Sequence, residues 1–179
     1  MVLQMAELPD VASEVQVSAN GHGSALLQVT ARYNVKSEAR EKSFMLNVTI
    51  VEETQNFLKL RIYMSYLKGK MSGMALLQVQ VPGGFEAELQ SLKDNTLVKK
   101  VEMKKRIVNI YFDSIPGDPI VLYVDVPMSR NDLVGKTQPA TVKIIDYYSP
   151  GNEVLTTYQS SILNQLEVCD LCGKDCKIC

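Results

Sequence analysis

The chain has 179 residues, of which 46% are hydrophobic and 22% charged, and its formal net charge is −1. This length and composition predict a globular protein that buries a core of its own, in one domain or slightly more. Neither nucleic-acid binding nor a membrane span is expected, because phosphate binding needs a clustered positive field and no apolar run approaches roughly 18 residues.

The N-terminal region is predicted to form short β-strands at residues 2–6, 13–19 and 24–33. The Asn20-Gly21 pair between the last two is a strong hairpin signal, because a type I′ turn requires positive φ at both central positions. Residues 1–9 lack the basic and continuous apolar regions of a signal peptide. If the protein is secreted, we therefore expect this chain to be part of a longer one.

A charged segment at residues 37–43 is interpreted as a linker, and strand patterns follow it. Strands are predicted at residues 44–51, 57–67 and 74–81. In the second of these, apolar and polar side chains alternate almost strictly, which is typical of a strand with one buried face.

Residues 85–93 are predicted to form a short surface helix. Phe85, Leu89 and Leu92 have the spacing of one helix face, and Glu86 and Glu88 would lie in the first turn, where the helix dipole favours anions.

The rest of the chain again predicts strands, at residues 97–103, 107–113, 120–126, 141–148 and 154–159. In the strand at 141–148, Val142, Ile144 and the pair Tyr147-Tyr148 supply the bulk that a sheet face buries. About seven strands in roughly 115 residues have the size and rhythm of an all-β, Ig-like antiparallel β-sandwich.

All four cysteines lie in the last eleven residues, at Cys169, Cys172, Cys176 and Cys179. Their spacing permits a structural zinc site, although such sites usually have a longer spacer between the two pairs. Disulfide bonds in an extracellular protein are the favoured interpretation, and the pairing stays open among three possibilities. The sequon Asn47-Val48-Thr49 is a candidate N-glycosylation site and adds weak support for secretion.

Residue patterns for catalysis are lacking in the sequence. The single histidine, His22, lies in a Gly-His-Gly turn, and no nucleophile elbow or metal-spaced histidine pair is present. A loop histidine of this kind is more often solvent-exposed than catalytic. We expect neither an enzyme nor a bound cofactor.

Two stretches resemble a known family. Pro139-Ala-Thr-Val-Lys-Ile-Ile-Asp-Tyr-Tyr148 resembles the penultimate strand of the C-terminal macroglobulin domain, which is the receptor-binding domain of the alpha-macroglobulin and complement superfamily. Gly21-His-Gly-Ser-Ala-Leu-Leu-Gln-Val-Thr30 resembles the last strands of the CUB domain that precedes it. The resemblance implies CUB-type strands at 1–36, the linker at 37–43, the receptor-binding sandwich at 44–160 and a cysteine-rich tail at 161–179.

The resemblance also implies a function. The chain would be the interaction domain of a secreted thioester-containing protein that acts in innate immunity, by complement-like opsonisation or by protease trapping. Its partners would be the thioester domain and other macroglobulin domains of the same parent, and after activation a cell-surface receptor or a microbial surface. The thioester motif itself is absent here and would belong to another domain. The alternative is a free-standing secreted binding module without such a parent.

The candidate binding residues are basic. They lie at the end of the predicted helix and on the following hairpin: Lys93, Lys99, Lys100, Lys104, Lys105 and Arg106. A solvated charged face is the simpler interpretation. In the family, receptor modules hold two lysines four residues apart on the helix, but here only Lys93 is present, with Gln90 and Glu86 at the preceding turns. Half of that motif is missing, so polyanions at the hairpin tip remain the alternative ligand.

Overall fold

The computed structural model describes residues 16–18, 20–24, 26–29 and 41–172. The chain divides into two units, residues 1–38 and 39–179. Among the described residues of the first unit, 21–23 form a bend in which Gly21 and Gly23 have φ of 156° and 127°, and none is assigned to a strand. Most of the predicted N-terminal strands and of the linker lie outside the described residues, so the CUB assignment stays a prediction.

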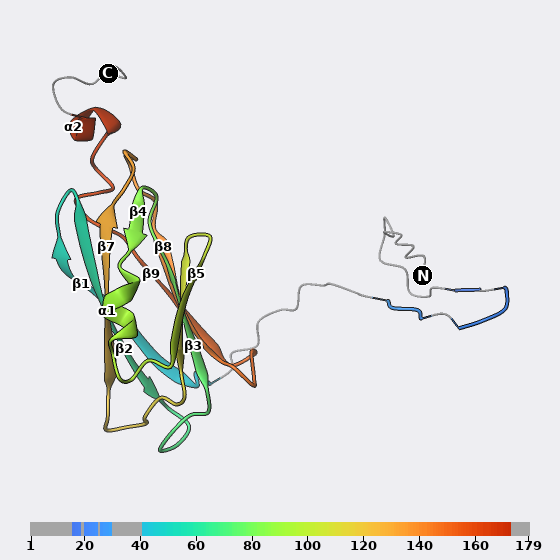
Figure 1. Cartoon of the computed structure of the whole chain (residues 1–179). Helices are drawn as coiled ribbons and strands as arrows, with labels where there is room; N and C mark the ends of the chain where they lie inside the picture. Colours follow the sequence, from blue (N-terminus) through green and yellow to red (C-terminus); the bar gives the residue numbers. More distant parts are fainter. Residues whose placement is uncertain (1–15, 19, 25, 30–40, 173–179) are drawn as a thin grey trace. The chain divides into compact units, whose positions relative to one another are not determined.

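The second unit contains two antiparallel sheets (Figure 1). The first has the order β1-β2-β7-β4. Its strands are β1 (Phe44–Glu53), β2 (Phe57–Tyr66), β7 (Leu122–Arg130) and β4 (Phe85–Ala87). The second has the order β5-β6-β3-β8-β9. Its strands are β5 (Lys100–Lys104), β6 (Ile107–Phe112), β3 (Ala75–Gln80), β8 (Ala140–Asp146) and β9 (Glu153–Tyr158). The predicted all-β sandwich is confirmed.

The core lies between the sheets and is built from alternate residues of each strand. On β2, Leu58, Leu60, Ile62 and Met64 are each 0% exposed, and Leu77 of β3 faces them with the same burial. Burying one such side chain contributes about 1.5–3 kcal/mol relative to leaving it in water. The alternation seen in the sequence therefore places one row of each strand inside and the other row outside.

The predicted helix at 85–93 is wrong in its first half. Phe85–Ala87 forms strand β4, whose residues pair with Arg130, Ser129 and Met128 of β7, and the helix α1 spans only Leu89–Lys93. Phe85 and Ala87 alternate with exposed Glu86, so both apolar groups enter the core from a strand. Pairing with β7 gives the backbone N–H and C=O groups of this segment hydrogen-bond partners. A two-turn helix on its own would be only marginally stable.

The two glutamates are consequently not in a helix turn. Glu86 lies in β4, and Glu88 occupies the N-cap position of α1 without capping it by a side-chain hydrogen bond. Its carboxylate instead accepts a hydrogen bond of 2.6 Å from the Ser129 hydroxyl.

Strand β7 runs four residues past its predicted end at Val126, through Pro127 to Arg130. Proline usually marks a strand end because it lacks an N–H donor. Here the Pro127 carbonyl accepts from the Glu88 N–H at 2.9 Å, on the side where β4 has already ended at Ala87. The missing donor of Pro127 faces that same side, so it interrupts no ladder pairing.

Residues after β9 pack onto the sandwich. Leu163 is 1% exposed within the core, and the backbone N–H of Lys136 donates to the Leu166 carbonyl at 2.7 Å. Helix α2 (Val168–Cys172) follows at that end of the sandwich (Figure 1). Within the described ranges no helix is long and apolar enough to cross a bilayer.

The carboxyl group of Glu53, at the end of β1, binds the segment that follows β9 by hydrogen bonds. It accepts hydrogen bonds from the Ser160 and Ser161 hydroxyls and, at 2.8 Å, from the Ile162 N–H. Burial raises the pKa of Glu53, but these hydrogen bonds together outweigh it and hold the pKa below its ordinary value of 4.5. The ionised form is therefore the one that the fold prefers.

We predict that Glu53→Gln lowers the free energy of unfolding by about 1–2 kcal/mol at neutral pH, because a charged acceptor is lost. Since the folded-state pKa is depressed, the carboxylate stabilises the fold above the unfolded-state pKa and loses that contribution as the pH falls through the folded-state pKa. Urea unfolding at several pH values checks this. The difference between wild type and variant should shrink below about pH 4, and a difference independent of pH would contradict the assignment.

Candidate functional site

The six basic residues singled out in the sequence are distributed over α1, the loop after it and the β5–β6 hairpin. Helix α1 packs against β5, the first strand of the hairpin, and against β7. Lys100 and Lys104 lie on one face of β5, separated by four residues or roughly 13 Å. The charges therefore line an edge of the sandwich and do not converge on one point.

Two of the six are neutralised locally. The Lys99 ammonium lies 3.2 Å from a carboxylate oxygen of Asp113, and that of Lys100 lies 2.6 Å from Glu102. The Lys100 ammonium also sits 5.4 Å from the ring centroid of Tyr111, whose hydroxyl donates to Glu102 at 2.7 Å. The hydrogen bond from Lys100 and then that from Tyr111 lower the pKa of Glu102. Lys99 and Lys100 thus belong to a charge-balanced cluster.

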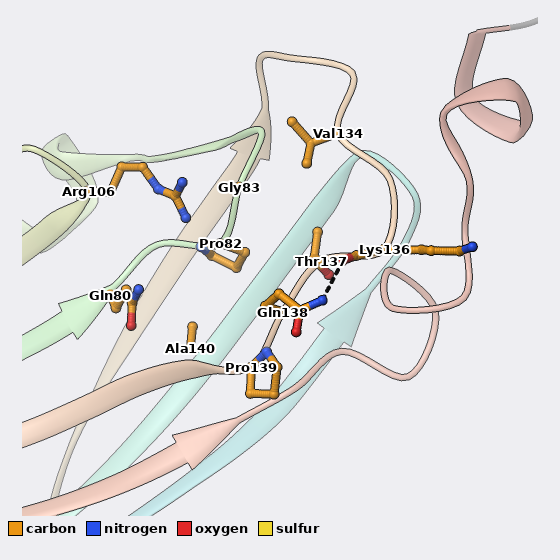
Figure 2. Close-up of a pocket in the computed structure, with 10 residues that line it drawn as sticks. All are labelled: Gln80, Pro82, Gly83, Arg106, Val134, Lys136, Thr137, Gln138, Pro139 and Ala140. Atoms are coloured by element: carbon orange, nitrogen blue, oxygen red, sulfur yellow. Dashed lines mark hydrogen bonds between the residues drawn. The ribbon is translucent and has the colours of Figure 1, made fainter. Parts of the chain in front are cut away.

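Arg106 is turned back onto its own sheet. Its Nε and Nη2 donate to the Val81 carbonyl at 3.4 and 3.3 Å. Figure 2 shows the guanidinium directed toward Pro82 and Gly83, at the rim of a shallow cavity of about 210 Å³. The cavity is lined by Gln80, Pro82, Gly83, Arg106, Val134, Lys136, Thr137, Gln138, Pro139 and Ala140.

This cavity is poorly equipped for chemistry. Arg106 and Lys136 are its titratable lining residues, and Figure 2 shows the Lys136 side chain extending away from the cavity. The Lys136 ammonium pairs with Glu167 at 2.7 Å. Among the described residues no carboxylate, histidine or thiol lines the cavity, so the Thr137 hydroxyl there has no such group beside it to activate it.

Two exposed lysines at the β5–β6 turn make no ion pair with the described residues. Lys104 ends β5 and Lys105 occupies the first position of the two-residue turn before Ile107, and both side chains are exposed. No carboxylate of the described residues lies within ion-pair distance of either. Lys105 has φ of 59°, a left-handed conformation that costs a residue with a Cβ about 1–2 kcal/mol. We call Lys104 and Lys105 the hairpin tip.

Lys93 is exposed at the C-terminal end of α1. The residue four positions before it is Leu89, which packs against the core. Glu86, which the sequence interpretation placed on the same helix, lies in β4. The helix therefore presents a single lysine, in agreement with the incomplete two-lysine pattern noted from the sequence.

The aromatic residues near Lys100 were misplaced by the sequence interpretation. Tyr147 and Tyr148 were expected to supply buried bulk, but they are 49% and 75% exposed. They follow β8, and Tyr147 lies 6.4 Å from Tyr111 and 5.5 Å from Tyr148 between ring centroids. The strand ends at Asp146, whose carboxylate accepts from the Tyr148 and Ser149 N–H groups and turns the chain. Alternation alone did not reveal this turn.

Cys169 and Cys172 lie on α2 and are both disulfide-bonded, while Cys176 and Cys179 lie outside the described residues. The pairing stays a prediction. Within the described part of the chain, no three side chains of His, Cys, Asp or Glu are grouped so that they could hold a metal ion. Asn47, the sequon asparagine, is exposed near the middle of β1.

Comparisons with known proteins agree with this architecture. The model of the family described as "A-macroglobulin receptor binding domain" matches residues 70–159. A curated relative, "Thioester-containing protein 1 allele R1" of Anopheles gambiae, is 23% identical over 184 residues, which cover 98% of this chain and 14% of the relative. The chain thus spans about one seventh of the length of that relative.

We predict that Lys105→Gly raises the free energy of unfolding by about 0.5–1 kcal/mol, because glycine adopts the left-handed conformation without a Cβ penalty. Lys104→Gly is the matched control, since it removes the same charge from a strand residue and should instead destabilise by a similar amount. Equilibrium denaturation of both variants measures the difference. Equal destabilisation by the two substitutions would show that Lys105 is not strained.

Proposed function

Because the chain belongs to the A-macroglobulin receptor-binding domain family, we propose that it is the interaction module of a larger secreted thioester-containing protein. The module itself carries out no chemistry. In the parent it packs against the thioester domain and other macroglobulin domains and shields the thioester until activation. The parent acts in innate immunity, by covalent opsonisation or protease trapping. The similarity to a mosquito thioester-containing protein over 98% of this chain supports the parent, of which this chain would be one part.

We further propose that the hairpin tip contacts a polyanionic cell or microbial surface. The observation that carries this proposal is the pair of exposed lysines that make no ion pair with any described residue, one of them held in a strained turn conformation. Strained residues persist where function or the surrounding structure requires them. The neighbouring Lys99 and Lys100 have their charge balanced by Asp113 and Glu102, so they attract an anion less strongly. The single lysine of α1 gives less support to a receptor that holds two helix lysines.

We predict that replacing both tip lysines by glutamine weakens binding to immobilised heparin by about two- to thirtyfold, since each exposed charge contact contributes roughly 0.2–1 kcal/mol. The matched control replaces Lys99 and Lys100 by glutamine, which changes the net charge equally. Affinity at several salt concentrations is the measurement. The tip variant should also show a shallower dependence on salt, because fewer counterions are released.

The control separates a local site from general charge. Equal weakening by both double variants would contradict a role for the hairpin tip and leave only overall electrostatics. No binding of heparin by the wild-type chain at low salt would refute the polyanion contact, while leaving the packing against a thioester domain to be tested separately.

The parent-level function has its own test. We predict that the parent protein, purified with an antibody against this chain, incorporates one methylamine and releases one thiol, as an intact thioester would. Mass spectrometry before and after exposure measures both changes. A long parent that incorporates no amine would act through non-covalent contacts alone. A parent no longer than this chain would refute the thioester role and favour a free-standing binding module.

A further inference from the structure

The outward face of the first sheet carries a row of side chains that the function above does not use. In the strand register, Asn47 of β1 lies opposite Tyr63 of β2, and Tyr63 lies opposite Tyr123 of β7. All three alternate with core residues, so they project from the same outer face. Directly opposite residues on one face have Cβ atoms about 4.5–5.5 Å apart, which places the Asn47 amide beside the Tyr63 ring.

The two tyrosines form an ordered aromatic shelf, which we define as Tyr63 and Tyr123. Their ring centroids are 6.1 Å apart with an interplanar angle of 48°. The Arg61 guanidinium carbon lies 4.8 Å from the centroid of the Tyr123 ring. Arg61 is fixed in turn by two hydrogen bonds to the Asp125 carboxylate, at 2.7 and 2.8 Å. The shelf is therefore held in place before anything binds it.

The shelf is partly open to solvent, with Tyr63 partly buried and Tyr123 exposed. Tyr123 is 51% exposed, although large aromatic rings are among the groups that gain most from being covered. On the neighbouring edge strand, Asn47 is exposed, Val48 points into the core and the Thr49 hydroxyl donates to the Arg61 carbonyl at 3.3 Å. An exposed sequon asparagine and a partly exposed aromatic surface thus occupy adjacent positions of one row.

We propose that Asn47 is N-glycosylated and that the first sugar of its glycan lies on the aromatic shelf. In the transfer, the Asn47 side-chain nitrogen forms a bond to C1 of the sugar, the bond from C1 to the diphosphate of a lipid-linked oligosaccharide breaks, and the leaving diphosphate takes up the proton. The apolar C–H face of the sugar ring covers Tyr63 and reaches toward Tyr123. The inference rests on the secretion included in the proposed function, because the donor is found in the secretory pathway.

A glycan at this position would also limit which surfaces of the domain can contact other domains. It would keep the outer face of the β1-β2-β7-β4 sheet in solvent. Contacts with other domains of the parent would then fall on the second sheet or on the edge that carries α1 and the hairpin tip.

The first test is acceptance of the sugar. The full chain, preceded by a cleavable secretion signal, is translated into microsomes. Addition of the glycan is measured as a shift in gel mobility, which does not depend on final folding. We expect a shift that peptide N-glycosidase removes and that persists in Thr49→Ser, which keeps the sequon. Asn47→Gln and Thr49→Val should abolish it. An unshifted wild-type chain would refute the site.

The second test addresses the shelf, on the chain secreted from human cells that make only high-mannose glycans. Trimming to a single sugar should leave the Tm nearly unchanged, and complete removal should lower it by about 2–4 °C. In Tyr63→Thr the same removal should lower it by less than half as much, whereas Tyr147→Thr, in the turn after β8 of the other sheet, should behave like wild type. Asn47→Asp made without a glycan corrects for the carboxylate that enzymatic removal creates.

If complete removal of the glycan lowers the Tm equally in wild type and in Tyr63→Thr, the contact between the sugar and the shelf is refuted. Each protein is compared with its own glycosylated form, so the effect of the substitution itself cancels. These outcomes can be distinguished from failure of the proposed function. Heparin binding through the hairpin tip should be unchanged in Asn47→Gln, and an absence of heparin binding would not alter the glycan mass.

Discussion

The two sheets are held together by the contact between their inward rows, in which side chains such as Leu60 of β2 and Leu77 of β3 are completely removed from water. Because the side-chain period of a strand is two, a shift of any strand by one residue would exchange its buried row for its exposed row. The cost would be several buried apolar side chains, each worth about 1.5–3 kcal/mol. Register is therefore fixed, and the positions of the outward residues follow from it. The hairpin tip and the aromatic shelf are consequences of how the core is packed.

The fold could be predicted largely because alternation and turn residues agree along most of the chain. The predicted strands at 44–51, 57–67 and 154–159 lie within a few residues of β1, β2 and β9. The errors occur where tertiary pairing overrides a local pattern. The three-residue strand β4 exists because β7 offers it a partner, and its sequence alone matches a helix face equally well. Burial of Leu163 after the last strand likewise depends on a surface formed by distant parts of the chain.

The basic residues could be found in the sequence, but their electrostatic state could not. Asp113 neutralises Lys99 across the hairpin, and the carbonyl that binds Arg106 belongs to Val81, on a different segment. Only the fold shows that, among the described residues, no carboxylate lies within ion-pair distance of Lys104 or Lys105. The relation between Asn47 and Tyr63 is hidden for the same reason, because it is set by strand register and not by sequence spacing.

Two glycines join three segments of backbone at one end of the sandwich. Gly84 has φ of 78°, and a Cβ there would lie 2.6 Å from the Asp132 carbonyl oxygen, while a Cβ on Gly135 would lie 2.7 Å from the Val168 nitrogen. The loop after β7 is thus pressed between the turn before β4 and the start of α2, main chain against main chain. Backbone hydrogen bonds from Lys136 to Leu166 and from Asn131 to Gly84 link the same three segments, so a displacement of α2 would be passed through the loop at 131–137 to the turn before β4. The tail is therefore tied to the edge of the first sheet through this loop and, through the buried Leu163, to the core as well.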